Sequence, residues 1–235
     1  FLRLVARVLP WLIAAPIVLF ALGLFQAMNA PDDYQQGATV KIMYLHVPSA
    51  WLGMLGWALM SAAALGTLVW RHPLADVAGK AAAPIGAAFT FICLVTGSLW
   101  GRPTWGTYWV WDARLTSMLV LLLLYLGVIA LYWTADDPNR GSRAAAVLTL
   151  VGALNLPIIK FSVDWWNTLH QPASILRMGG SAIDPSILVP LLIMAVAFTL
   201  LFFTLHLAAM RNEILRRRLR TMQLMQAQSL AEAGA

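Results

Sequence analysis

The sequence predicts an all-α, polytopic integral membrane protein with six transmembrane helices and short interfacial helices in its outer loops. The first observation is composition, since 60% of the 235 residues are hydrophobic and only 11% are charged. Soluble domains carry roughly 25% charged residues. The second observation is segregation, because the charged residues gather in short stretches between long uncharged runs. The net charge of +6 is therefore explained by membrane topology, and no nucleic-acid partner is expected.

Six apolar runs are long enough to cross a hydrocarbon core, which needs about 20 helical residues. Backbone polar groups in lipid must pair within the segment, so each run is predicted to be a helix. The first run is too long for a signal peptide and is interpreted as a retained span. The fifth is short, and we expect it to extend into its flanks. The predicted spans are Leu9–Met28, Ser49–Trp70, Ala81–Trp100, Leu115–Trp133, Ala144–Ile159 and Pro185–Leu207.

Basic residues at the span ends predict the orientation, because cytoplasmic loops carry an excess of Lys and Arg. Eleven of the 16 Lys and Arg residues flank the side that includes both termini, and five flank the other side. We therefore expect both termini in the cytoplasm and loops 29–48, 101–114 and 160–184 outside. Residues 1–210 are interpreted as one membrane domain and 211–235 as a basic cytoplasmic tail. That tail either binds anionic lipid or docks on a cytoplasmic subunit, and the sequence favours neither.

Several classes of protein are disfavoured by what the sequence lacks. It contains no GxxxxGK[ST], GxGxxG, HExxH or GxSxG motif, so nucleotide hydrolysis or zinc hydrolase chemistry by those routes is not expected. His206, near the inner end of the last span, is the only ionisable group in an apolar run, whereas proton-driven carriers need several. Cys93 is the only cysteine, which excludes an intrachain disulfide and a CxxCH heme attachment site.

The second outer loop is unusually rich in aromatic residues. An interfacial aromatic belt explains one or two rings at a span end but not five in thirteen residues. If residues 104–112 are helical, Trp105, Trp109 and Asp112 share one face and form a platform for a flat apolar ligand. Gly101 and Gly106 would let that ligand approach the backbone. The aromatic residues of the loop are Trp100, Trp105, Tyr108, Trp109 and Trp111.

Two histidines are predicted in outer loops that flank the aromatic loop in sequence. His46 ends the first outer loop and His170 lies in the third, and each precedes a proline by two residues. Neutral imidazole is the usual axial ligand of heme iron, so both are candidate heme-iron ligands. Because the CxxCH motif is missing, this would be noncovalently held heme b. Whether both histidines bind iron at once is left open.

Other residues have supporting or contrasting roles in this interpretation. Trp165 and Trp166 precede His170 and would close the pocket or anchor a short interfacial helix in which Trp165 and Leu169 share a face.

His72, in a cytoplasmic loop, is expected to be solvated, and His206 is expected to contact headgroups. Asp112 is expected to cap the fourth span. Heme propionates need cations, and Arg102 and Arg114 are preferred over the other outward candidates, Lys41, Lys160 and Arg177.

Residues 100–112 resemble the WWD domain of the heme-handling protein superfamily. The similarity extends through residues 112–117 and the six-span layout, and it is closest to the heme exporter protein C family of bacterial system I cytochrome c maturation. Tyr108 stands where many relatives are expected to carry Trp, which keeps an aromatic ring. The resemblance supports His46 and His170 as heme ligands, because family members carry one histidine in each of these loops.

The resemblance also implies a location and partners. It implies a bacterial inner-membrane protein that presents heme on the periplasmic side to a periplasmic heme chaperone. We do not expect the chain to be an enzyme, and whether it assists the covalent attachment of heme to that chaperone is left open. It further implies an ABC-type complex with an ATPase, membrane subunits and a small single-span accessory subunit. Three alternatives stay open: a heme lyase of the cytochrome c synthetase type, a b-type heme electron carrier and a plain ABC permease. The span count and the positions of the histidines favour heme presentation.

Overall fold

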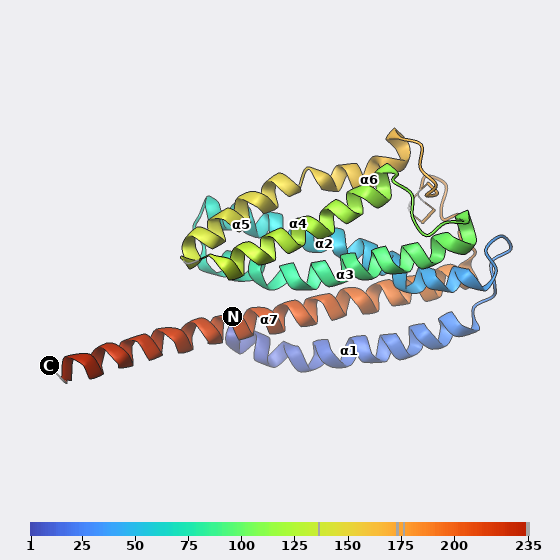
Figure 1. Ribbon diagram of the computed structural model, residues 1–235. Coiled ribbons are helices and arrows are strands. Elements are labelled where there is room, and N and C mark those ends of the chain that lie inside the picture. The colour runs from blue at the N-terminus through green and yellow to red at the C-terminus, as the bar shows by residue number, and fades with distance from the viewer. Residues whose placement is uncertain (136, 173, 176, 234–235) are drawn as a thin grey trace.

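The computed structural model describes residues 1–135, 137–172, 174–175 and 177–233, and most of these are helical (Figure 1). Six helical segments are long and apolar enough to cross a membrane, which confirms the predicted fold class. Within the described residues the elements are α1 (Leu2–Asn29), the 3-10 helix η1 (Ala38–Ile42), α2 (Met43–Leu68), α3 (Pro73–Trp105), α4 (Ala113–Thr134), α5 (Pro138–Gly152), α6 (Asn155–Trp165) and α7 (Pro185–Ala233).

Local sequence signals account for several helix ends. The Asp112 carboxylate accepts a hydrogen bond from the Leu115 backbone N–H at 2.8 Å, which confirms the predicted cap of the fourth span. Asp137 caps α5 in the same way, and Pro138 fills the first helical position, where no N–H is needed. Gly106 ends α3 with φ at +79°, a left-handed conformation that favours glycine.

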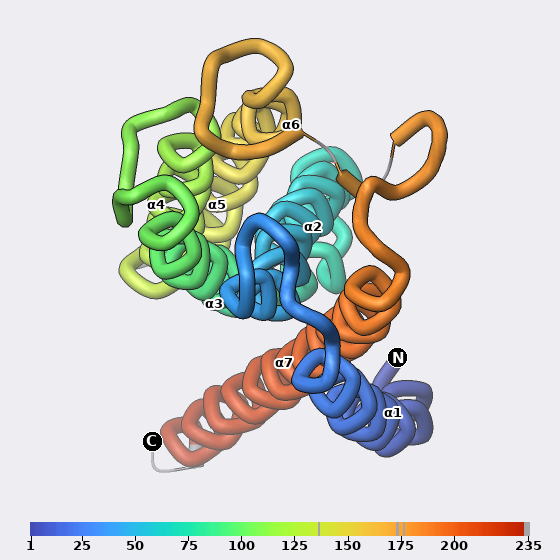
Figure 2. Tube along the Cα trace, turned by 90° about the vertical axis from the view of Figure 1, so that its right-hand side faces the viewer, coloured from blue at the N-terminus to red at the C-terminus, as the bar shows by residue number. Residues whose placement is uncertain are grey.

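The helices form two groups in the end-on view of Figure 2. Helices α2 to α6 pack together, and α7 lies between them and α1, which packs mainly on α7. Close approach inside the larger group depends on small residues. The Tyr125 hydroxyl donates to the Gly53 carbonyl at 2.8 Å, and the Tyr125 ring lies against Gly86, where a side chain would collide with it. Trp57 is fully buried beside them and donates to the Thr149 carbonyl at 3.0 Å.

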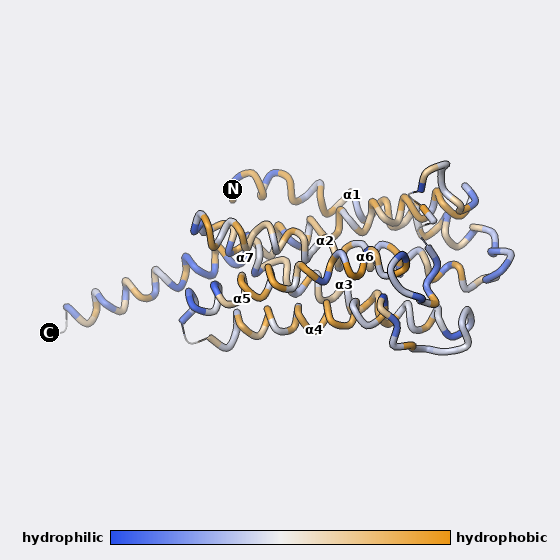
Figure 3. The backbone as a smooth tube through the Cα atoms, turned by 90° about the horizontal axis from the view of Figure 1, so that it is seen from above, coloured by the Kyte–Doolittle hydropathy of each residue, from blue (hydrophilic) through white to orange (hydrophobic). Residues whose placement is uncertain are grey.

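Polar residues gather at the two ends of the bundle, and apolar residues cover its length (Figure 3). The two termini lie toward the same end in Figure 1, together with the starts of α3 and α5. The eleven basic residues assigned to that side belong to or adjoin these segments in the sequence. The three predicted outer loops lie at the opposite end. The loops that the basic residues assigned to one side of the membrane thus lie at one end of the helix bundle, and the other loops lie at the opposite end.

Some predicted boundaries differ from the structure. The fifth span extends into both flanks as expected, but a turn at residues 153–154 divides it into α5 and α6. The predicted tail continues α7 without a break, and residues 234–235 lie outside the described part. The expected headgroup contact of His206 is wrong, because the side chain is only 9% exposed and stacks on Phe202 at 6.0 Å between ring centroids. His72 is exposed, as predicted.

Candidate functional site

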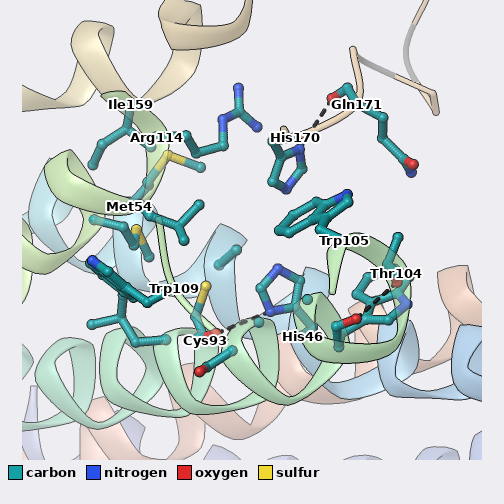
Figure 4. Close-up of a pocket in the computed structure, with 18 of the residues that line it drawn as sticks. His46, Met54, Cys93, Thr104, Trp105, Trp109, Arg114, Ile159, His170 and Gln171 are labelled. Carbon is teal, nitrogen blue, oxygen red and sulfur yellow. Dashed lines mark hydrogen bonds between the residues drawn. The ribbon is translucent and has the colours of Figure 1, made fainter. Parts of the chain in front are cut away.

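A pocket lies at the end of the bundle that carries the predicted outer loops. Its walls come from α2, α3, α4, α6 and the segment after α6, and it encloses about 120 Å³ with an open side. Segments far apart in sequence therefore meet here, as Figure 4 shows. The structure brings six of the predicted site residues into its lining: His46, Trp100, Trp105, Trp109, Arg114 and His170.

His46 is held by contacts that leave one of its ring nitrogens available. Its Nδ1 lies 3.0 Å from the Cys93 carbonyl oxygen and 3.1 Å from Thr96 Oγ1. A carbonyl oxygen only accepts hydrogen bonds, so Nδ1 of the neutral ring carries the proton and donates. Nε2 then has a free lone pair, which is the form of imidazole that binds a metal.

The expected position of His46 in a loop is wrong. The residue lies in the first turn of α2, which begins at Met43 rather than near Ser49. The sequence Met43-Tyr44-Leu45 before it is apolar and continues the helix, so the span starts earlier than its hydropathy maximum suggests. A helical backbone holds the imidazole more rigidly than a loop would.

His170 approaches the same pocket from the segment after α6. Its Nδ1 lies 3.1 Å from the Gln171 carbonyl oxygen, so Nδ1 again donates and Nε2 is left with its lone pair. Burial lowers the pKa of His170, and the positive charge of Arg114 lowers it further. The ring centroid of Trp105 lies 6.1 Å from that of His170. Both histidines therefore line one pocket with Nδ1 engaged by a backbone carbonyl.

The aromatic loop does not form the predicted helical platform. Helix α3 ends at Trp105, and residues 106–112 are irregular because Gly106 turns the chain back. Trp105 and Trp109 still both line the pocket. Trp100 meets His46 edge to face, with 5.7 Å between centroids, and its Nε1 donates to Gln36 Oε1 at 2.9 Å. The Trp105 and Trp109 rings thus meet in one pocket because the chain turns at Gly106, and not because they lie on one face of a helix.

Arg114 is the cation that the structure places in the pocket. Its Nε donates to Ser162 Oγ at 2.9 Å and one terminal nitrogen lies 3.3 Å from the Lys160 carbonyl oxygen. These contacts orient the guanidinium from α4 toward α6 and leave donors for a carboxylate. The other preferred cation, Arg102, donates to the Gly106 carbonyl and lies over the Tyr108 ring, outside the lining.

The remaining predicted residues lie near the pocket but not in its lining. Trp111 is 76% exposed and packs edge to face on Trp109. Trp165 ends α6 and stacks on Phe161, so the expected helical face shared with Leu169 is wrong. The predicted residues that do not line the pocket are Arg102, Tyr108, Trp111, Asp112, Trp165 and Trp166.

Three residues of α3 contribute to the site although they were not predicted to do so. Cys93 and Thr96 accept the His46 hydrogen bonds, and Gly97 leaves room for the ring. A Cβ atom on Gly97 would lie 2.7 Å from Cε1 of His46. Helical spacing was the missed signal, because positions 93, 97, 100 and 104 follow one face of α3 toward the aromatic loop.

The chemistry of the pocket suits a flat, anionic molecule that carries its own metal. Within the described residues there is no group of three or more His, Cys, Asp and Glu side chains that could hold a bare metal ion. Two imidazoles suffice for heme, since the macrocycle supplies the other iron ligands. Trp109 Nε1 is buried and makes no hydrogen bond within the described part of the chain, so it could donate one to a bound ligand. The enclosed volume is below the roughly 300–1,000 Å³ of usual ligand pockets, so a heme would also occupy the open side.

Comparisons with known proteins agree with this picture. The family model described as heme exporter protein C matches residues 1–225. A heme exporter protein C of Bradyrhizobium diazoefficiens is 74% identical over 238 residues, covering 100% of this chain and 90% of the relative. That of Escherichia coli K12 is 52% identical over 208 residues, covering 88% and 84%. A Marchantia polymorpha mitochondrial protein named for cytochrome c biosynthesis is 46% identical over 180 residues, covering 75% and 76%. The chain belongs to the heme exporter protein C family.

Proposed function

We propose that this protein binds heme in the pocket at the outer end of the bundle and presents it to an acceptor for cytochrome c maturation. The single observation that carries the proposal is the pair of imidazoles, each with Nδ1 engaged by a backbone carbonyl, that face one pocket. The names of the relatives support heme as the cargo and cytochrome c biosynthesis as the context. Their name as exporters supports delivery rather than catalysis.

Each wall of the pocket would have a separate task in binding. His46 or His170 would supply a lone pair to the iron, and the indoles of Trp105 and Trp109 would cover the faces of the macrocycle. Aromatic contacts of this kind contribute roughly 0.5–1.5 kcal/mol per pair beyond burial. Arg114 would pair with a propionate, which is a charge-assisted and partly desolvated contact. The open side would allow an acceptor to reach the heme edge.

The arrangement favours presentation over electron transfer. A b-type electron carrier needs paired histidines inside its spans, whereas the two histidines on spanning helices here, His46 in the first turn of α2 and His206 on α7, lie toward opposite ends of the bundle. The acceptor would be a periplasmic heme chaperone. An ATPase and membrane subunits of an ABC-type complex would provide the nucleotide sites for which this sequence has no phosphate-binding motif.

The proposal includes an orientation. Both termini would lie in the cytoplasm of a bacterial inner membrane, and the pocket would face the periplasm. The support is the excess of basic residues at the end where the termini lie. An alkaline phosphatase fused after residue 235 would then be inactive, and one fused within residues 106–112 would be active. The reverse pair of activities would contradict the orientation without affecting the pocket.

The function is tested by the visible spectrum of the purified chain after incubation with heme. A Soret band is expected for the wild type, and His46→Ala and His170→Ala are each expected to weaken or shift it. His72→Ala is the matched control, because His72 is exposed at the opposite end. Unchanged binding in the double variant His46→Ala/His170→Ala would overturn the assignment of the iron ligands.

A further inference from the structure

A second cleft, larger than the first, lies at the opposite end of the bundle. It encloses about 420 Å³ between the first turns of α3, the end of α4, the start of α5 and the part of α7 that leaves the bundle. In Figure 1 these segments lie at the left, where α7 projects past the other helices. Six charged side chains line this cleft: Asp76, Lys80, Glu213, Arg216, Arg217 and Arg220.

The charges of this cleft do not balance. Glu213 pairs with Lys80 at 3.2 Å and with Arg216 and Arg217 at 2.8 Å. Asp76 pairs with Arg217 at 2.5 Å and accepts a hydrogen bond from Ser142. The cleft thus holds four cations and two carboxylates, which leaves two positive charges in excess.

The excess charge has donors that can reach a ligand. Arg216 uses its Nε and one terminal nitrogen on Glu213, so other N–H groups of its guanidinium are free. Arg220 makes no ion pair within the described part of the chain, and it lines the same cleft one helical turn further on. An anionic ligand would find these two side chains on one face of α7 at a spacing of four residues.

An aromatic wall places the cleft at the depth of lipid headgroups. Tyr132 and Trp133 end the membrane-spanning part of α4, and Trp133 is 78% exposed. Lys80 Nζ lies 5.8 Å and 5.9 Å from the centroids of the two rings. Exposed Trp and Tyr side chains at span ends sit at the membrane interface. The cleft therefore opens toward the bilayer surface, where phospholipid phosphates lie.

We propose that this cleft is a binding site for an anionic phospholipid, with the headgroup phosphate between Arg216 and Arg220 and the acyl chains beside Trp133. Basic pockets between transmembrane helices on the cytoplasmic side are suited to such headgroups. The interfacial aromatic wall favours a lipid over an acidic segment of a soluble protein, which would not need a wall facing the hydrocarbon. In the proposed orientation the site belongs to the cytoplasmic leaflet. It does not depend on heme binding.

The test compares two double variants of the purified full chain in detergent by native mass spectrometry. Arg216→Gln/Arg220→Gln removes two cations from the cleft and keeps the pairs that join α3 to α7. Arg211→Gln/Arg218→Gln removes two exposed cations of the same helix that do not line the cleft. Both variants lose the same charge, so a difference between their affinities for the lipid can be attributed to the cleft. Thermal unfolding of each variant checks that the fold is kept.

We expect the wild type to bind phosphatidylglycerol at least tenfold more tightly than phosphatidylcholine. Each arginine near a headgroup is worth about 1 kcal/mol, so the cleft variant, which loses two, should bind about thirtyfold more weakly and the control less than twofold more weakly. Equal losses in the two variants, or no preference for phosphatidylglycerol, would overturn the proposal. Displacement of the lipid by millimolar inorganic phosphate would replace it with a small-anion site. Tighter binding of an oligoglutamate peptide would replace it with a protein-docking site.

Discussion

Replacing Gly97 with alanine should weaken heme binding without unfolding the protein. The added Cβ would lie 2.7 Å from His46 Cε1 and 3.3 Å from its Nδ1, where ordinary carbon contacts need about 3.5–4.0 Å. The imidazole borders the pocket and can move into it by about 1 Å, so the main chain is not forced to shift. That movement would stretch the hydrogen bonds to Cys93 and Thr96, now 3.0 and 3.1 Å long, beyond the usual range.

The size of the effect follows from the role of those hydrogen bonds. Partners that orient a metal-binding histidine typically contribute 10–100-fold in affinity, so Gly97→Ala should raise the heme Kd by about that factor. Alanine is also favoured over glycine inside a helix by about 1 kcal/mol. This gain offsets part of the strain, and the thermal midpoint should change little.

The assay is a heme titration followed at the Soret band, with a thermal unfolding curve for each protein. Gly79→Ala is the control on the same helix, because its Cβ would meet atoms at 3.4 and 3.6 Å, which are ordinary contacts. It should bind heme like the wild type. If Gly97→Ala binds heme within twofold of the wild type and with the same Soret position, the argument that α3 orients His46 is refuted.

Three further predictions concern the same pocket. Thr96→Val removes one acceptor of the His46 Nδ1 proton and should weaken heme binding by about tenfold in the Soret titration. An unchanged Kd would mean that the Cys93 carbonyl alone is enough to orient the His46 ring. Trp105→Leu should lower heme affinity by about three- to tenfold, because the Trp105 ring lines the pocket. Trp111→Leu should leave the affinity unchanged, because the Trp111 ring is 76% exposed. Equal losses in the two variants would contradict the assignment of heme to this pocket. Burial lowers the pKa of His170, so its imidazole stays neutral at pH values just below 6.5, where the unfolded chain binds a proton. Heme affinity should therefore be constant from pH 7.5 to about 6.5 and fall only as the pH drops through the lowered pKa, whereas a Kd that follows an ordinary histidine titration would contradict this assignment.

The membrane fold and the division into two ends could be predicted from the sequence. Length and hydropathy are enough to identify spans, because the bilayer excludes unpaired backbone groups along each segment independently of its neighbours. The distribution of Lys and Arg predicted which loops lie together, because the loops on the cytoplasmic side of a membrane carry the excess of basic residues. The density of aromatic residues in loop 100–112 and the positions of His46 and His170 also predicted site residues. The structure brings both histidines and three of the tryptophans of that loop into the lining of one pocket.

The working geometry of the pocket depended on packing between distant segments. Gly106 turns the chain in a left-handed conformation, so Trp105 and Trp109 meet the pocket while Trp111 faces outward, and no helical periodicity describes that turn. Arg114 rather than Arg102 lines the pocket because Ser162, 48 residues away, holds its guanidinium. Contacts of this kind join residues whose separation in sequence carries no local signal, so they follow from how the helices pack and not from the pattern of any one segment.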